Sequence, residues 1–252
     1  MTVYQKLLDI RESEGAGFLV LIDPDSAPPD ELAERAVQCQ RAGTDFLLVG
    51  GSLMLRDGFS EAVSAVKKAC SLPIVIFPGN PGQLSADADA LLFLSLISGR
   101  NPQHLIGDQV IAAPAVKKLG LEVIPTGYML ISSSTPTAAE FMSDTQPLPR
   151  DKPGLAAAHA LAGQYLGLKL IYLEAGSGAR ESVPEDLIAE VRGWVDLPLI
   201  VGGGIRSPEE AAAKVRAGAD FIVVGTEFEG NPAEERIREF CQAVREEGKK
   251  RI

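Results

Sequence analysis

Apolar and polar positions follow two different rhythms along the chain. Short, nearly continuous apolar runs rich in β-branched residues are typical of strands that are buried on both faces of a parallel sheet. Between them lie stretches such as DELAERAVQCQRAG and SPEEAAAKVRAG, whose apolar spacing predicts amphipathic helices. The runs that we predict as strands are 18–22, 45–50, 73–79, 90–97, 122–131, 168–176, 198–204 and 220–226.

Eight strands that alternate with helices favour an α/β fold of the (β/α)₈ TIM-barrel type over an open sheet. The length of 252 residues suits one such barrel, and no change of composition marks a boundary, so we expect a single barrel domain over 1–252. The segment PGQLSADAD, between the third and fourth strands, is too short for a regular helix and predicts a reduced third crossover. The Pro-rich QPLPRDKP, between the fifth and sixth strands, predicts a loop over the barrel mouth followed by a helix.

Composition narrows the class of protein. No apolar run approaches the roughly 18 residues of a membrane span, and MTVYQKLLDIRESEG lacks a signal-peptide core, so we expect a soluble cytoplasmic protein. The net charge of −10 argues against nucleic acid as a partner, because phosphate neutralisation needs clustered Lys and Arg. Cys39, Cys70 and Cys241 fit neither a metal spacing nor a disulfide framework, and we expect reduced, buried thiols.

The carboxyl ends of the strands are where this fold builds its active sites. At the seventh strand, Gly203 and Gly204 precede IRSPEE, in which Ser207 is suited to cap a helix and Pro208 to begin it. At the eighth strand, Gly225 and Thr226 open the next loop. Backbone amides and a helix N-terminus bind phosphate without Lys or Arg, so a phosphate site is favoured over a pair of tight turns.

Glu174 closes the otherwise apolar strand LKLIYLEAG beside these loops. A carboxylate at a barrel mouth acts as a general base when its surroundings raise its pKa, or it accepts hydrogen bonds from loop amides; the sequence leaves both readings open. Tyr172 lies two residues earlier and is expected to point to the same face of the strand.

Other strand ends carry weaker candidates. Asp23 and Ser52 end the first two strands and are placed to share a Mg²⁺, although Asp-Pro is also common turn chemistry and the spacing alone favours the turn. Arg100 ends the fourth strand and is a candidate for a diphosphate, with helix capping or a surface position as the alternative. We interpret His104 and His159 as structural or surface residues and Trp194 as part of the core, which leaves the candidate set at Asp23, Ser52, Arg100, Tyr172, Glu174 and the glycine loops.

Read together, the strand-end motifs are more specific than any one of them. The sequence resembles the geranylgeranylglyceryl phosphate synthase family, which includes the bacterial heptaprenylglyceryl phosphate synthases. The long insert with SDTQPLPRDKP is similar to the archaeal-type branch, and the resemblance covers nearly the whole chain. The motifs that carry it are LIDPD, VGGS, FPGN, SGRNP, PTGYMLI, SDTQPLPRDKP, YLEAGSGA, VGGGIRS and VVGT.

The resemblance implies a prenyl transfer in which the 3-hydroxyl of sn-glycerol-1-phosphate attacks C1 of a long prenyl diphosphate, geranylgeranyl being the expected donor. It implies Mg²⁺ at Asp23 and Ser52, a homo-oligomer (dimer or hexamer), and a product that partitions into the membrane. Our reading of the residues fits this chemistry, with Glu174 expected to accept the proton of the glycerol hydroxyl and Tyr172 to orient the glycerol or Glu174. Arg100 for the diphosphate is our own addition. The positions that match the glycerol phosphate site are Tyr172, Leu173, Glu174, Ala175, Gly176, Ser177, Gly178, Gly203, Gly204, Gly225 and Thr226.

Two other functions compete with this one. A sugar-phosphate isomerase barrel of the histidine or tryptophan biosynthesis type shares the phosphate loops, but it needs a second acid or base at the fifth strand, where this chain has Thr126 and Tyr128. A non-catalytic phosphate sensor is the other, and the set of Asp23, Ser52 and Glu174 argues against it. For the synthase, the reduced third crossover is a plausible opening for the prenyl tail, along 82–96.

Overall fold

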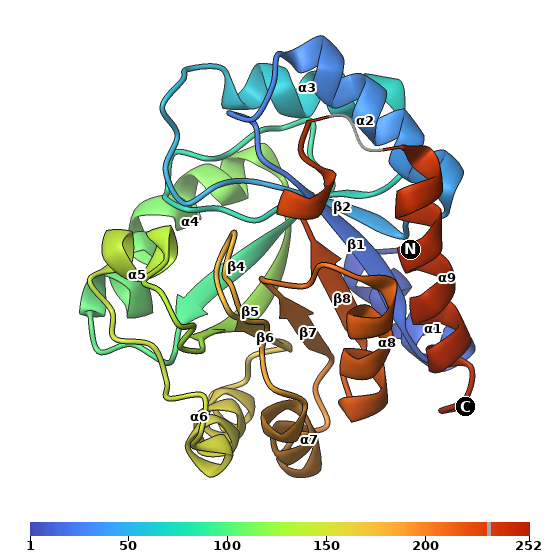
Figure 1. Ribbon diagram of the computed structural model, residues 1–252. Coiled ribbons are helices and arrows are strands. Elements are labelled where there is room, and N and C mark those ends of the chain that lie inside the picture. The colour runs from blue at the N-terminus through green and yellow to red at the C-terminus, as the bar shows by residue number, and fades with distance from the viewer. Residues whose placement is uncertain (231–232) are drawn as a thin grey trace.

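The computed structural model describes residues 1–230 and 233–252, in which the strands form one closed parallel barrel surrounded by helices (Figure 1). Each strand pairs with the next one in the chain, and β8 pairs with β1, so the predicted (β/α)₈ barrel is confirmed. The strands are β1 (Gly17–Ile22), β2 (Phe46–Val49), β3 (Ile74–Ile76), β4 (Ala90–Leu96), β5 (Glu122–Leu130), β6 (Leu170–Glu174), β7 (Leu199–Gly202) and β8 (Phe221–Val224).

The helices lie outside the strands, and their ends follow the local sequence. Gly43 ends one of them in a left-handed conformation (φ 97°), and Ser207 caps another as predicted, its hydroxyl accepting the amide of Glu210. The helices are α1 (Val3–Glu14), α2 (Pro29–Ala42), α3 (Phe59–Ala69), α4 (Asp108–Leu119), α5 (Ala138–Ser143), α6 (Pro153–Tyr165), α7 (Glu185–Trp194), α8 (Pro208–Ala217) and α9 (Glu234–Gly248), with a π-helical turn at Gln103–Gly107 and a 3₁₀ turn at Thr226–Phe228.

Two apolar layers hold the barrel together, because successive strand residues point to opposite faces. One layer lies between the strands and the helices, and the other fills the barrel interior. Val3 and Leu7 of α1 join the interior layer, so α1 closes the amino-terminal end of the barrel. The interior layer also contains Leu19, Phe46, Leu48, Val75, Ala90, Leu92, Ile124, Leu170, Tyr172, Ile200, Phe221 and Val223.

The third crossover is reduced, as predicted, since the described segment 77–89 between β3 and β4 contains no helix. The crossover is nevertheless fixed, because the buried side chain of Gln83 holds it against the end of β2. Its Nε2 donates to the carbonyl of Gly51 at 2.8 Å, and its Oε1 accepts the amide of Gly79 at 2.9 Å. This side chain takes over part of the positioning that a crossover helix provides elsewhere in the barrel.

The long insert between β5 and β6 partly matches its prediction. Its Pro-rich part is non-helical and precedes α6, whereas the short helix α5 was not foreseen. Thr137 caps α5 by accepting the amide of Glu140. Leu148 then pairs with Ile131 in an isolated parallel bridge just beyond the end of β5, so the insert returns to the barrel mouth.

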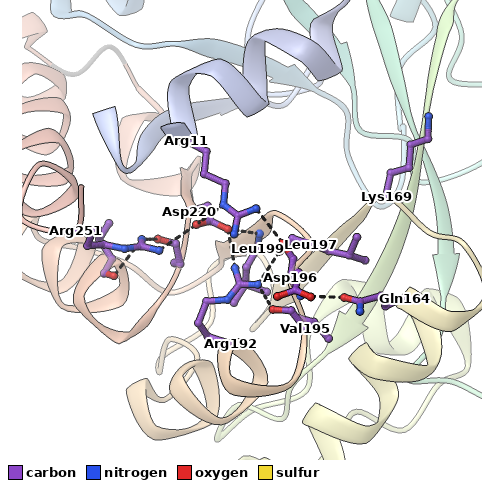
Figure 2. A network of polar contacts seen from close by, with 12 residues as sticks. Arg11, Gln164, Lys169, Arg192, Val195, Asp196, Leu197, Leu199, Asp220 and Arg251 are labelled. Atoms are coloured by element: carbon purple, nitrogen blue, oxygen red, sulfur yellow. Dashed lines mark hydrogen bonds and ion pairs between the residues drawn. The ribbon is translucent and has the colours of Figure 1, made fainter. Parts of the chain in front are cut away.

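The opposite end of the barrel is closed by an ionic cluster around Asp220, which Figure 2 shows in detail. This fully buried carboxylate receives Arg11 at 3.2 Å, Arg192 at 2.9 Å and Arg251 at 3.1 Å, and it also accepts the amide of Leu199. The three arginines come from α1, α7 and the carboxyl-terminal segment. The cluster therefore joins both ends of the described chain to β8.

Two other predictions can be compared with the structure. Cys39 and Cys241 are buried free thiols and Cys70 is a half-buried one, in agreement with the prediction of reduced cysteines. The placement of Trp194 in the core is wrong, because its side chain is 48% exposed at the end of α7.

No helix within the described residues combines the length and apolarity needed to span a membrane.

Candidate active site

A cavity of about 610 Å³ opens at the carboxyl ends of the strands. A shallower hollow of about 650 Å³ lies outside the barrel between α2 and α3, and none of the predicted residues lines it. We therefore assign the site to the cavity at the strand ends. The predicted residues that line it are Asp23, Ser52, Tyr172, Glu174, Ser177, Gly178, Gly203, Gly204, Gly225 and Thr226.

Three residues of the predicted glycerol phosphate stretch do not line the cavity. Leu173 and Ala175 alternate with Tyr172 and Glu174 and pack into the layer between strands and helices. Gly176 donates its amide to Glu174 at 2.6 Å, from behind the site. These positions shape the end of β6 rather than the surface that a ligand meets.

Arg100 is not among the cavity-lining residues either. Its guanidinium donates to the carbonyl of Gly99 at 2.7 Å and lies 3.1 Å from Nε2 of His159. The structure thus places Arg100 in contact with its own loop and with α6, exposed and outside the cavity, which corresponds to the surface position considered as its alternative.

Glu174 is the most perturbed carboxylate of the site. Glu174 is 6% exposed, and this burial raises the pKa of its carboxyl to about 7. The amide of Gly176 and the nearby Tyr172 hydroxyl act in the opposite direction and lower the pKa. A carboxyl group with this pKa is divided between its charged and neutral forms near neutral pH. It is therefore able to accept a proton from a bound hydroxyl.

Three aromatic rings form the cavity floor below Glu174. Tyr172 stacks on Phe77 with ring centroids 5.0 Å apart, and Tyr128 meets both rings edge-on at 5.6 Å. Desolvation raises the pKa of both Tyr128 and Tyr172 well above the ordinary tyrosine value, and the charge of Glu174 is the second cause. The Tyr172 hydroxyl is buried near Glu174, and no partner among the described residues meets the geometry of a hydrogen bond to it.

The glycine run after β7 has a partner that the sequence did not reveal. Gly203 has a φ of 83°, and a Cβ there would lie 2.3 Å from Oε1 of Glu174. Gly204 has a φ of 70° and packs against the backbone of Glu181 and Ser182. Glycine is required at 203 for two reasons, the left-handed backbone and the close approach of the carboxylate.

A cationic side chain stands beside the glycine loops, where the sequence predicted binding by backbone groups alone. Arg206 lines the cavity, and its NH2 donates to the carbonyl of Ala179 at 3.0 Å. Across the same region the hydroxyls of Ser177 and Thr226 lie 3.3 Å apart. Arg206 stands in the motif VGGGIRS, and its position directly after the glycine run was the available signal.

The residues at the ends of β1 and β2 fit a Mg²⁺ ion that takes few ligands from the protein. Asp23 is half-buried, its Oδ1 accepts the amide of Asp25, and its carboxylate packs so closely on Gly51 that a Cβ there would lie 3.2 Å from Oδ1. Ser52 adds a hydroxyl to the same wall. No group of three or more His, Cys, Asp or Glu among the described residues is placed to hold a metal ion, so a cation at Asp23 and Ser52 would need further ligands from outside these side chains.

The remaining part of the wall, formed by β4, the π-helical turn and α5, is mostly apolar. Leu94, Leu96 and Met142 lie here, together with His104, whose Nδ1 lies 2.7 Å from Oδ2 of Asp108. The sequence interpretation of His104 as a structural or surface residue missed its place in the cavity. The cavity thus has a polar region at β6–β8 and an apolar region beside α5.

The comparisons with known proteins place the chain among its relatives. A family model described as "PcrB family" matches residues 8–244. The chain belongs to the PcrB family. A geranylgeranylglyceryl phosphate synthase of Chitinophaga pinensis is 46% identical over 242 residues, covering 96% of this chain and 95% of that protein. The synthase of the same name from Pyrococcus horikoshii is 44% identical, covering 90% and 89%.

A solved structure that is similar to this chain contains one of the expected substrates. It is the (S)-3-O-geranylgeranylglyceryl phosphate synthase of Thermoplasma acidophilum in complex with sn-glycerol-1-phosphate. It superimposes with a TM-score of 0.93 at 38% identity, covering 98% of this chain and 99% of that one. The family resemblance inferred from the strand-end motifs is confirmed, and neither the isomerase nor the sensor is favoured by these relatives.

Proposed function

We propose that this protein joins a long-chain prenyl diphosphate to the 3-hydroxyl of sn-glycerol-1-phosphate, forming an ether and releasing pyrophosphate. The observation that carries the proposal is the buried Glu174 carboxyl, whose pKa of about 7 suits a base, in a cavity that also holds glycine loops and Asp23. The relatives named above supply the reaction class. A prenyltransferase of the geranylgeranylglyceryl phosphate synthase type is the function these observations support best.

The glycerol phosphate is assigned to the polar region of the cavity. Its phosphate would lie against Gly204, Gly225 and the N-terminus of α8, with Arg206 adding a positive charge. Its 3-hydroxyl would then point towards Glu174, which accepts the proton as the carbon–oxygen bond forms. Tyr172 would orient Glu174 or the glycerol from below.

The prenyl diphosphate is assigned to the apolar region and to the wall of Asp23 and Ser52. Mg²⁺ held by these two residues would supply a Lewis acid for the charge that develops on the departing pyrophosphate. The tail would follow Leu94, Leu96 and Met142 towards the third crossover. Of the predicted opening along 82–96, only Leu94 and Leu96 line the cavity, and the crossover contributes 77–80 instead.

The position of the tail is testable by one substitution on β4. Leu94→Trp would fill the apolar region, and we expect the preferred donor to become shorter, because the end of a long tail no longer fits. Phe93→Trp is the matched control, since residue 93 points to the outer face of the same strand. An unchanged ranking of farnesyl, geranylgeranyl and heptaprenyl diphosphate in Leu94→Trp would place the tail elsewhere.

The metal and the donor are tested with purified protein and sn-glycerol-1-phosphate. We expect mass spectrometry to detect the ether with Mg²⁺ present, to detect none after chelation, and to show the highest yield with geranylgeranyl diphosphate. Ether formation that persists under chelation would remove Mg²⁺ from the proposal, and absence of ether from every donor would remove the synthase.

The oligomeric state and the cellular location of the protein stay predictions. Exposed apolar side chains on α4 and α6, among them Val110, Ile111, Leu155 and Tyr165, support a homo-oligomer, either a dimer or a hexamer. Light scattering in solution distinguishes these from a monomer. We further expect a cytoplasmic enzyme whose lipid product enters the membrane.

A further inference from the structure

Arg35 is a buried cation that the proposed reaction does not use. It lies on α2 with 5% of its surface exposed, and its Nε has no hydrogen-bond partner among the described residues. No described carboxylate lies within ion-pair distance of it. Removing a guanidinium from water without a paired carboxylate is unfavourable by several kcal/mol. The burial of Arg35 therefore calls for a reason other than stability.

The contacts of Arg35 lead to the candidate metal ligand. Its NH1 donates to the hydroxyl of Ser26 at 3.1 Å, and that hydroxyl donates in turn to the carbonyl oxygen of Asp23 at 2.7 Å. The amide of Ser26 donates to the same carbonyl at 3.1 Å. A short chain of hydrogen bonds thus runs from the buried Arg35 guanidinium through Ser26 to the backbone of Asp23, and it holds the loop that carries Asp23.

The charge of Arg35 also affects a second acidic residue of the cavity wall. Glu229 lies after β8 and lines the cavity. Burial first, and then the charge of Asp23, raise the pKa of Glu229, while the Arg35 guanidinium acts in the opposite direction. The positive charge of Arg35 therefore lies close enough to Glu229 to oppose the effect that the charge of Asp23 has on this carboxyl.

We propose that Arg35 is a positioning residue for the metal side of the cavity, which fixes the loop of Asp23 through Ser26. The inference rests on the proposed Mg²⁺-dependent function. It adds two residues, Arg35 and Ser26, that contact neither substrate. Their effect is expected on cation affinity and not on glycerol phosphate binding, because the polar region lies at β6–β8.

Two substitutions separate this role from a purely structural one. Ser26→Ala breaks the hydrogen-bonded chain at an exposed residue, and Ser26→Thr restores the hydroxyl. Arg35→Met removes the charge and keeps an unbranched side chain; since no described carboxylate pairs with the guanidinium, we expect a melting temperature equal to or above that of the wild type. Arg41→Met makes the same change on the exposed face of α2 and serves as the control.

The readout is binding of Mn²⁺ in the presence of inorganic pyrophosphate, followed by electron paramagnetic resonance. We expect Ser26→Ala and Arg35→Met to raise the half-saturating Mn²⁺ concentration by about tenfold, the lower end of the effects seen when groups that orient a metal ligand are removed. Ser26→Thr and Arg41→Met should match the wild type. The KM for sn-glycerol-1-phosphate, measured at saturating Mg²⁺, should not change in any variant.

The outcomes distinguish this inference from the proposed function. Wild-type protein that forms ether and binds Mn²⁺, with both variants equal to it, overturns the role of Arg35 alone. Variants that lose glycerol phosphate affinity and melting temperature in parallel with cation affinity show a general structural role and also overturn it. Wild-type protein that forms no ether overturns the proposed function, whatever the variants bind.

Discussion

Glu174 concentrates the chemistry of the site in one side chain. Its carboxyl is buried at the end of β6, and the pKa of about 7 follows mainly from that burial. A base of this kind is active only when deprotonated. We therefore expect kcat to fall as the pH drops below about 7 and to level off above it, because protonation removes the acceptor for the glycerol hydroxyl. The profile should be taken for kcat, since the phosphate of the substrate also titrates near pH 6 and affects KM.

Replacing Glu174 by Gln tests the assignment more strongly. We expect kcat to fall by about 10²–10⁴-fold, the range for loss of a general base, and the pH dependence near 7 to disappear. A variant that keeps both its rate and its pH profile would exclude Glu174 as the base. Asp186→Asn, which removes a carboxylate at the start of α7 and outside the cavity, is the control.

The same carboxyl lowers the stability of the folded protein at high pH. Its pKa is raised above the ordinary 4.5, so the folded state favours the neutral form. Stability is lost between about pH 4.5 and 7, because there the group ionises in the unfolded chain but stays protonated in the folded protein, and the loss levels off above pH 7. A shift of this size corresponds to roughly 3 kcal/mol. We expect Glu174→Gln to melt at a higher temperature than the wild type at pH 8 and at a similar temperature at pH 4.5. Calorimetry at both pH values measures this, and a lower melting temperature of the variant at pH 8 would contradict the assigned pKa.

At the scale of elements, the loop after β7 is built around glycine. A side chain at 203 meets Glu174 and the backbone of Gly176, whereas one at Gly43, which has a φ of 97°, meets nothing within 4 Å. Gly203→Ala and Gly43→Ala should therefore both lose about 1–2 kcal/mol through the left-handed backbone. Only Gly203→Ala is expected to lose kcat, because only there does the new Cβ displace the base. Equal kcat values in the two variants would contradict this placement of Glu174.

The elements also show which features the sequence can predict. The strands were located to within two or three residues, because a strand buried on both faces reads as a continuous apolar run. Helix α5 was missed, since six residues between Pro- and Ser-rich neighbours give no helical period. Trp194 was misplaced because α7 ends there and the ring lies against solvent, which periodicity alone does not reveal.

The residues of the candidate site also fall into those that the sequence predicted and those that it did not. Asp23, Ser52, Glu174 and the glycine loops were found because the fold brings all strand ends to one edge of the barrel. Arg206 and Gln83 take their positions through contacts between segments far apart in the sequence, with Ala179 and Gly51 respectively. His104 contacts Asp108 on the next helical turn, and only the folded barrel shows that it lines the cavity. Arg100 shows the converse, since this residue follows a strand end but contacts Gly99 and His159 of α6 and does not line the cavity.

At the scale of the whole molecule, the two ends of the barrel have separate tasks. The Asp220 cluster closes the amino-terminal end and joins α1, α7 and the carboxyl-terminal segment (Figure 2). None of its charged residues lines the cavity. Asp220→Asn would leave the three arginines without their shared carboxylate. We expect it to lose about 3–5 kcal/mol of stability while kcat below the melting transition stays unchanged.

Thermal unfolding and kinetics together test this separation. Asp196→Asn is the control, because Asp196 is exposed and takes part in the cluster through its backbone. A fall in kcat that accompanies the loss of stability in Asp220→Asn, at temperatures where the protein is folded, would mean that the two ends of the barrel are coupled.

The stereochemistry of the acceptor provides the most direct test of the proposed reaction. Purified protein with Mg²⁺ and geranylgeranyl diphosphate is given either sn-glycerol-1-phosphate or its sn-3 enantiomer, and the products are identified by mass spectrometry. We expect a geranylgeranyl ether from the 1-phosphate, none from the 3-phosphate, and little from either with Glu174→Gln. Ether formed equally from both enantiomers, or from neither, would contradict the proposed placement of the glycerol hydroxyl beside Glu174.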